Sequence, residues 1–146
     1  MKIAVLHGPN LNLLGSREPD IYGSTTLAQI DARLREVARE LSVEISCFQS
    51  NHEGALIDAI HGLRGVAAGA IINAGAFSHT SLAIRDAFAA TSLPYVEVHV
   101  SNIFSRELER RRTVLASGAV GVVCGLGASG YEYALRGLAA RLTPRG

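Results

Sequence analysis

The segment Tyr95 to Val100 places a carboxylate and an imidazole two residues apart, at Glu97 and His99. Alternate side chains of a strand share a face, so these two project together while the intervening valines face the other way. A strand buried in a parallel sheet is normally apolar on both faces. A carboxylate beside an imidazole orients the ring and supports its protonated form, which could act as an acid. The alternative is a satisfied structural pair, but the position near a strand end favours chemistry.

A second candidate lies in a long irregular loop after the first apolar run. Residues about 12–24 are rich in turn formers, and a loop of this length in a compact domain is often a lid. It carries Arg17 and Tyr22, five residues apart. A guanidinium near a phenol favours the phenolate, which would make the tyrosine a usable base. Ordinary surface residues are the alternative interpretation of this spacing.

Further polar residues fall where strands are expected to end. Asn10 follows the first strand, Asn73 ends the third, and Ser101 and Asn102 follow His99. Ligands of doubly wound folds bind at the carboxyl ends of the strands, beside the point where the strand order reverses. We therefore expect these side chains to gather around one binding site.

Two more groups could hold an anionic or hydroxylated ligand. Arg106 and Arg110 are four apart and would share one face of a helix, where they either grip a ligand or lie solvated on the surface. His79 precedes a helix whose first N–H groups could receive an anion, unless it is only a turn residue.

Some patterns point away from other chemistries. Residues 125–130 match G-x-G-x-x-G but follow the last strand, too late for a dinucleotide site, so they indicate a tight turn. His7, His79 and His99 could share an edge, yet no spaced metal-ligand set such as C-x-x-C is present. Lys2 is the sole lysine, which argues against a buried catalytic amine. We expect no metal and no cofactor.

The elements that position these residues alternate between short apolar strands and amphipathic helices. Thr26 and Gln29 form a capping box before a helix with apolar residues at helical spacing, and Ser50 and Glu53 predict a second capping box. Strands are expected at 3–6, 43–48, 70–72, 95–100 and 120–124, with helices at about 80–91, ended by Pro94, and 130–142. This pattern predicts an α/β, flavodoxin-like three-layer sandwich with a five-stranded parallel sheet in the order 2-1-3-4-5.

The composition fits one domain over residues 1–146. Hydrophobic residues make up 48% and charged residues 18%, and the net charge is +1, so the chain is neither disordered nor a general nucleic-acid binder. No apolar stretch is long enough for a membrane span, and the first apolar run is too short for a signal peptide. Cys47 and Cys124 are expected to be buried free thiols, as in a reducing cytoplasm. We expect a cytoplasmic protein.

Together, these motifs resemble those of one family, type II 3-dehydroquinate dehydratase (type II dehydroquinase), over essentially the whole chain. The resemblance is carried by Gly8-Pro9-Asn10-Leu11-Asn12-Leu13-Leu14-Gly15, Arg17-Glu18-Pro19, Tyr22-Gly23, Gln49-Ser50-Asn51, Asn73-Ala74-Gly75, His79-Thr80-Ser81, Arg85-Asp86, Glu97-Val98-His99-Val100-Ser101-Asn102, Gly125-Leu126-Gly127 and Gly130-Tyr131.

The resemblance implies the anti elimination of water from 3-dehydroquinate, through an enolate, to give 3-dehydroshikimate. Tyr22 would be the base, Arg17 would hold it as phenolate, and Asn10 would position a water against the enolate. His99, oriented by Glu97, would protonate the departing hydroxyl. The remaining implied roles are carboxylate binding by Asn73 with the backbone of Val100 and Ser101, binding of ring hydroxyls by His79 and Arg110, and a contact of Asp86 with a neighbouring subunit's site.

The resemblance also implies a homo-oligomer built from trimers, usually a dodecamer. The chain departs from the family after Arg110, where a His-Ser-Tyr-like run is usual and Arg111-Arg112-Thr113 stands here. Ala74 replaces a common proline. Two other functions stay open: a non-catalytic sensor of a quinate-like ligand, and an enzyme acting on a related cyclic hydroxy acid.

Overall fold

The computed structural model describes residues 1–16 and 18–145. Its elements follow in the order β1 (Lys2–His7), η1 (Leu11–Leu13), α1 (Pro19–Tyr22), α2 (Leu27–Leu41), β2 (Glu44–Gln49), α3 (Glu53–Gly62), β3 (Gly69–Asn73), η2 (Gly75–His79), α4 (Leu82–Thr91), β4 (Tyr95–His99), η3 (Ile103–Ser105), α5 (Leu108–Arg111), η4 (Ala116–Gly118), β5 (Gly121–Cys124) and α6 (Ser129–Leu142), where η denotes a short 3₁₀ helix.

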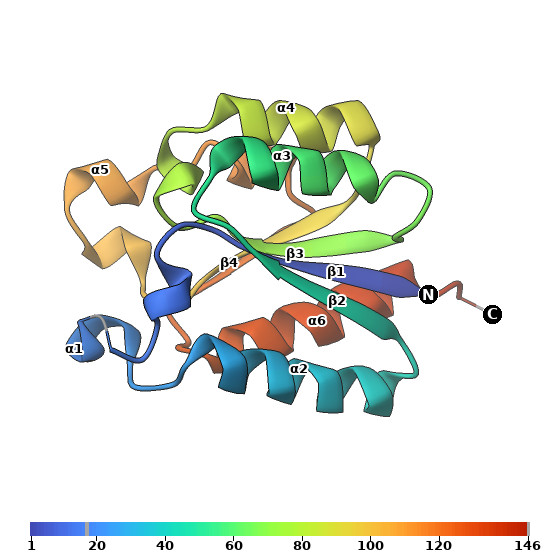
Figure 1. The fold of residues 1–146 in the computed structure, drawn as a ribbon, viewed down its shortest axis with the longest axis horizontal. Helices are drawn as coiled ribbons and strands as arrows, with labels where there is room; N and C mark the ends of the chain where they lie inside the picture. The colour runs from blue at the N-terminus through green and yellow to red at the C-terminus, as the bar shows by residue number, and fades with distance from the viewer. Residues whose placement is uncertain (17, 146) are drawn as a thin grey trace.

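The five strands form one parallel sheet in the order β2-β1-β3-β4-β5. Helices α2 and α6 cover one face and α3 and α4 cover the other (Figure 1). This is the flavodoxin-like arrangement that the βα alternation predicts, because right-handed crossovers place helices on both faces. All strands point the same way, so their carboxyl ends meet at one edge.

The faces of β4 separate as expected. Val96, Val98 and Val100 pack with α2 and α6, whereas Tyr95 packs with α3 and α4. Glu97 and His99 lie on the Tyr95 side and are buried. The period-2 pattern therefore places the two polar side chains inside the protein and not on its surface.

Two local expectations from the sequence are wrong. The predicted capping box at Ser50 does not form: His52 is the N-cap of α3, and the Ser50 hydroxyl instead accepts the His52 N–H at 3.0 Å. By contrast, both bonds of the Thr26–Gln29 box are present.

Cys47 and Cys124 are free thiols but only half-buried, because each lies on a strand at a sheet edge. The pKa of the Cys47 thiol is nevertheless raised to about 12, mainly by burial and secondly by the charge of Asp31.

The segment after β1 passes very close to the end of β3. Gly8 donates its N–H to the Asn73 carbonyl at 2.7 Å, and a Cβ on Gly8 would lie 2.4 Å from the Ala74 carbonyl. Only glycine allows this approach. The chain then forms η1 and α1, so the predicted lid contains a short helix that carries Tyr22; Arg17 lies outside the described residues. No described helix is long and apolar enough to cross a membrane.

Candidate active site

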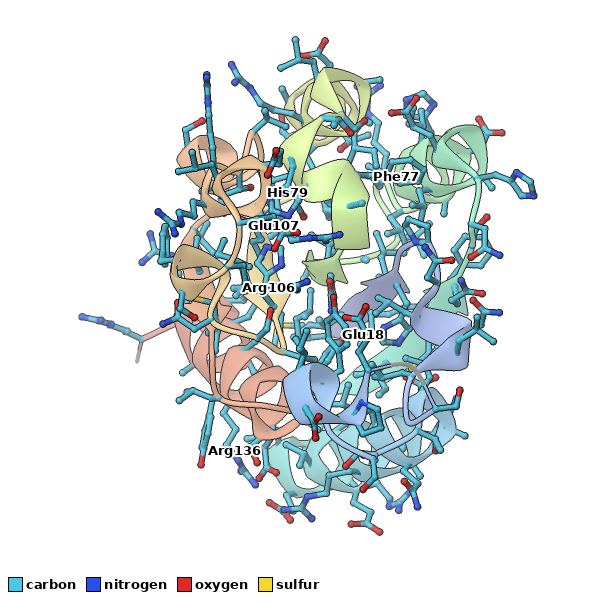
Figure 2. The ribbon with its side chains drawn as sticks, turned by 90° about the vertical axis from the view of Figure 1, so that its left-hand side faces the viewer. Glu18, Phe77, His79, Arg106, Glu107 and Arg136 are labelled. Atoms are coloured by element: carbon cyan, nitrogen blue, oxygen red, sulfur yellow. The ribbon has the colours of Figure 1, made fainter. Side chains whose placement is uncertain are left out.

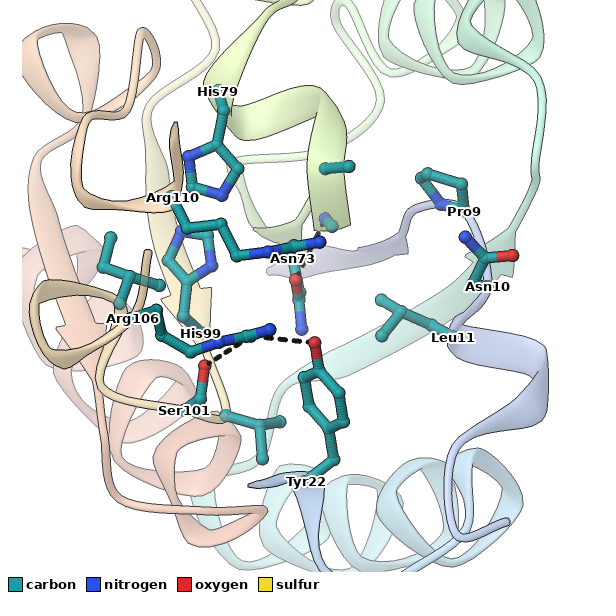
Figure 3. A pocket seen from close by; sticks show the side chains of 14 residues that line it. Pro9, Asn10, Leu11, Tyr22, Asn73, His79, His99, Ser101, Arg106 and Arg110 are labelled. Atoms are coloured by element: carbon teal, nitrogen blue, oxygen red, sulfur yellow. Dashed lines mark hydrogen bonds between the residues drawn. The ribbon is translucent and has the colours of Figure 1, made fainter. Parts of the chain in front are cut away.

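A pocket opens at the carboxyl ends of β1, β3 and β4, on the side of the molecule shown in Figure 2. The segment between β4 and β5 and the lid complete its wall. Figure 3 shows it from close by. Its lining residues are Pro9, Asn10, Leu11, Tyr22, Asn73, Gly75, Ala76, His79, His99, Val100, Ser101, Ile103, Arg106 and Arg110. The lining includes two arginines and two histidines but no carboxylate, so the pocket suits an anionic ligand.

The acid predicted from β4 is in place. His99 Nε2 lies 2.9 Å from Glu97 Oε1, and the Glu97 side chain is fully buried. A carboxylate can only accept, so the ring N–H donates to it and Nδ1 is the nitrogen not bound by Glu97. Glu97 Oε1 also accepts the Thr113 hydroxyl. The carboxylate therefore fixes the orientation of the ring.

The predicted base, Tyr22, lines the same pocket from the lid. Arg106 Nη1 donates to the Tyr22 hydroxyl oxygen at 2.8 Å and lies 3.3 Å from the Ser101 hydroxyl (Figure 3). The guanidinium carbon is also 5.3 Å from the centre of the Tyr22 ring. The predicted base therefore has a mostly buried cation bonded to its hydroxyl oxygen. The predicted partner, Arg17, is not among the described residues.

The local structure around Arg106 differs from the one that the sequence predicted. We expected it to share a helical face with Arg110, but η3 ends at Ser105, Arg106 is extended, and α5 begins only at Leu108. Both arginines nevertheless line the pocket. The contact with Tyr22 spans 84 residues, so no local spacing signals it. Only the topology, which brings the lid and the segment after β4 to one edge, could have suggested it.

Asn73 is held from two sides at the end of β3. Its Oδ1 accepts the Gly75 N–H at 3.1 Å, and its Nδ2 donates to the Tyr131 hydroxyl at 2.9 Å. The Asn73 Nδ2 atom carries two hydrogens, so the second one is left for a ligand in the pocket. Tyr131 comes from α6 and is 1% exposed; its burial raises its pKa. The Asn73 amide is thus pre-oriented as a donor.

His79, at the end of η2, and Arg110, in α5, also line the pocket. The rings of His79 and His99 stack with centroids 5.9 Å apart, and His79 Nδ1 lies 2.7 Å from the Arg112 carbonyl. Arg110 is paired with Glu107. Both side chains lie in Figure 3 above Asn73, with Tyr22 on the far side of the pocket. They could bind hydroxyl groups of a ring placed between them and the lid.

The remaining predicted residues separate into those at the pocket and one outside it. Asn10 lines the pocket with its backbone in the left-handed region (φ 67°), and its N–H donates to Asn51 Oδ1 at 3.0 Å. Val100 and Ser101 line it as well. Asp86 is exposed on α4 and does not line the pocket.

The site offers no cluster for a metal ion among residues 1–16 and 18–145. His7 points away from the pocket, with Nε2 2.8 Å from Asp31 Oδ1. The fold and the site define an α/β protein whose cationic pocket, lined by the predicted base on the lid and the predicted acid on β4, suits acid–base chemistry on a small anion.

Comparisons with known proteins identify the family. The profile described as Dehydroquinase class II matches residues 1–139. A 3-dehydroquinate dehydratase of Gemmatimonas aurantiaca is 61% identical over 94% of this chain and 91% of its own length, and one of Synechococcus sp. is 55% identical over 97% of both. The crystal structure of type II dehydroquinase from Butyrivibrio crossotus superposes with a TM-score of 0.92 at 42% identity, covering 94% of this chain and 97% of that one. The chain belongs to the class II dehydroquinase family.

Proposed function

We propose that this protein is a hydro-lyase that removes water from 3-dehydroquinate to give 3-dehydroshikimate, a step of the shikimate pathway. Family membership supports the reaction, and one observation supports the mechanism. The Tyr22 hydroxyl and the Glu97–His99 pair line one pocket, each already bonded to the group that its role needs. Base and acid thus belong to separate elements, the lid and β4, which suits an elimination in which one group removes a proton and another donates one.

In this mechanism, the Tyr22 phenolate takes the proton beside the ketone and leaves an enolate. Arg106 stabilises the phenolate before the transfer, and Arg17 would add a second cation from the lid. Asn10 positions a water against the enolate oxygen, which offsets the developing charge. The enolate then expels the hydroxyl group, His99 protonates it, and it departs as water. Glu97 holds His99 in orientation.

The substrate carboxylate binds the free Nδ2–H of Asn73 and the backbone N–H groups of Val100 and Ser101. The ring hydroxyls bind His79 and Arg110. The support is positional: all of these residues line the same pocket as His99. Residues about 12–24 act as the lid, and closure excludes water from Tyr22 and strengthens its interaction with the arginines. The single domain spans 1–146 and uses no metal or cofactor.

The test follows the absorbance of the conjugated enone product after addition of 3-dehydroquinate. The wild type should produce it, and Tyr22→Phe should bind substrate without turning it over, because the ring packs while the base is missing. Treatment with a chelator should not change the rate. A folded wild type that forms no enone from 3-dehydroquinate would overturn the proposed function.

We also propose a cytoplasmic homo-oligomer assembled from trimers, with four trimers in a dodecamer and Asp86 reaching the site of a neighbouring subunit. Asp86 and Leu82 are four residues apart on α4 and share a face, and Leu82 is 57% exposed, which suits a subunit contact. Light scattering at assay concentration tests the assembly. Asp86→Ala should lower activity while Asp58→Ala, on the exposed surface of α3, should not; a fully active monomer would remove Asp86 from the site.

A further inference from the structure

The segment that departs from the family pattern, residues 111–115, lies directly behind the proposed acid. Thr113 donates its hydroxyl hydrogen to Glu97 Oε1, the same oxygen that His99 contacts. We propose that Thr113 is a positioning residue that keeps Glu97 an anionic acceptor and thereby keeps His99 protonated for the elimination. The inference rests on the proposed function and concerns a residue outside the pocket lining.

The direction of the hydrogen bond follows from its surroundings. The Leu115 N–H donates to Thr113 Oγ1 at 3.1 Å, so this hydroxyl accepts from the backbone and its own hydrogen is left for Glu97. Glu97 Oε1 then accepts from both Thr113 and His99, so a proton on this carboxyl group would have to sit on Oε2. In this proposal the two donated hydrogen bonds keep Glu97 as the carboxylate.

Glu97 depends on the bond from Thr113 because its side chain has few hydrogen-bond partners. Its side chain is fully buried, and Oε2 makes no hydrogen bond with any residue in the described part of the chain. A buried carboxylate without partners takes up a proton, since desolvation disfavours the charge. Without the Thr113 hydroxyl, the Glu97 carboxylate would keep only its hydrogen bond from His99 among the described residues. A proton on Glu97 would then remove the negative charge that faces His99.

The other charged and titratable groups nearby make that charge necessary. His99 is faced by His79 from η2, by Arg106 and Arg110 from the segment after β4, and by Tyr22 from the lid. Two fixed cations disfavour a further positive charge on the ring. On the other side, Glu97 is faced by Tyr95, whose pKa rises to about 12 through burial first and the charge of Glu97 second, opposed by Arg85.

Thr113 is held where it can do this. The Val114 N–H donates to the Ser78 carbonyl at 2.8 Å, the Arg112 carbonyl bonds His79, and the Leu115 carbonyl accepts the Tyr95 hydroxyl. Bonds on both flanks thus fix the segment against η2 and β4. Turning the Thr113 side chain away from Glu97 would also break its bond with the Leu115 N–H.

The experiment compares Thr113→Val, which keeps the shape and removes the hydroxyl, with Thr113→Ser, which keeps the hydroxyl. Thr91→Val is the matched control, because it removes a hydroxyl that bonds only the backbone carbonyls of Ala87 and Phe88 at the end of α4. We measure kcat and KM against pH. In Thr113→Val, kcat should fall by roughly 10- to 100-fold, the value of a hydrogen bond to a charged group, with KM changed by about twofold or less. The alkaline limb of kcat should move to lower pH.

Thr113→Ser should restore kcat to within about threefold and return the alkaline limb to its place. An unmoved limb in Thr113→Val, or a serine variant as impaired as the valine one, would overturn the proposal. A wild type without activity on 3-dehydroquinate would instead contradict the proposed function. NMR titration of the His99 ring signal compares the wild type, Thr113→Val and Thr113→Ser without turnover. The signal is assigned by its absence from His99→Gln. If Thr113→Val does not fold, Thr113→Ala replaces it in both measurements.

Discussion

Arg106 donates to the hydroxyl oxygen of Tyr22 at 2.8 Å, across 84 residues of sequence. Arg106 is mostly buried, with 13% of its side chain exposed, and it also contacts Ser101 beside the acid. A phenol is a poor base near neutral pH unless its anion is stabilised. The contact therefore gives the proposed base, which lies on the lid, a cation from the segment after β4.

The first prediction concerns this cation. Arg106→Gln keeps a hydrogen-bond donor near Tyr22 but removes the charge, so kcat/KM near neutral pH should fall by about 10²- to 10³-fold, comparable to the loss of one preorganised electrostatic contact. The acidic limb of the kcat/KM profile should move to higher pH, because the phenol must ionise unaided. Arg64→Gln, on the exposed surface after α3, is the control. An acidic limb at the wild-type pH would show that Arg106 does not tune Tyr22.

The second prediction concerns the acid. His99→Ala should lower kcat by about 10²- to 10⁴-fold, the usual contribution of a positioned acid, with a smaller effect on substrate binding. Steady-state kinetics and a binding titration measure the two effects. His61→Ala, at the exposed end of α3, should behave as wild type. Turnover of the His99 variant near the wild-type rate would mean that the departing hydroxyl takes its proton from another group.

The third prediction separates binding from chemistry. Tyr131→Phe fills the same buried space but leaves Asn73 Nδ2 without its acceptor. The freed amide should lose its fixed orientation toward the substrate carboxylate, so KM should rise by roughly 3- to 10-fold, the value of one neutral hydrogen bond, with kcat changed less. Tyr133→Phe, whose side chain is exposed, controls for the loss of a hydroxyl on α6. A fall in kcat alone would contradict the role of Tyr131 in binding.

The sequence predicts the framework of the site because periodicity is a local property. The five strands, their order and the burial of Glu97 and His99 follow from apolar runs and from the period of 2 in β4. The Thr26–Gln29 box also follows from spacing alone, since its partners are three residues apart. The residues proposed for the chemistry were found through strand ends and the family resemblance, and their roles stay predictions.

The details that spacing could not predict are contacts between distant segments. Arg106 with Tyr22, and Thr113 with Glu97, depend on how the segment between β4 and β5 folds back over the edge of the sheet. That segment has three short helical elements, η3, α5 and η4, and no periodic pattern that predicts its path. The failed capping box at Ser50 shows the same limit on a smaller scale: Ser50 accepts the His52 N–H, and α3 begins only at Glu53, after the N-cap His52.

The last prediction concerns stability beneath the site, where the buried His7 bonds Asp31 at 2.8 Å. Burial raises the pKa of Asp31, but the hydrogen bond and charge of His7, with smaller contributions from Cys47 and Arg35, leave it below the ordinary 3.8. A carboxyl whose pKa is lowered by folding takes up protons on unfolding. Its stabilisation is therefore complete above the unfolded pKa and is lost as the pH falls through the folded one.

Asp31→Asn should accordingly lower the free energy of unfolding by about 1–2 kcal/mol at pH 7, the value of a charged hydrogen bond. The difference from wild type should shrink as the pH falls below about 4, where the wild-type carboxylate also loses its charge. Urea unfolding at several pH values measures both, with Asp58→Asn on the exposed face of α3 as the control. A difference that stays constant down to pH 3 would mean that the pair contributes through packing and not through the charge of Asp31.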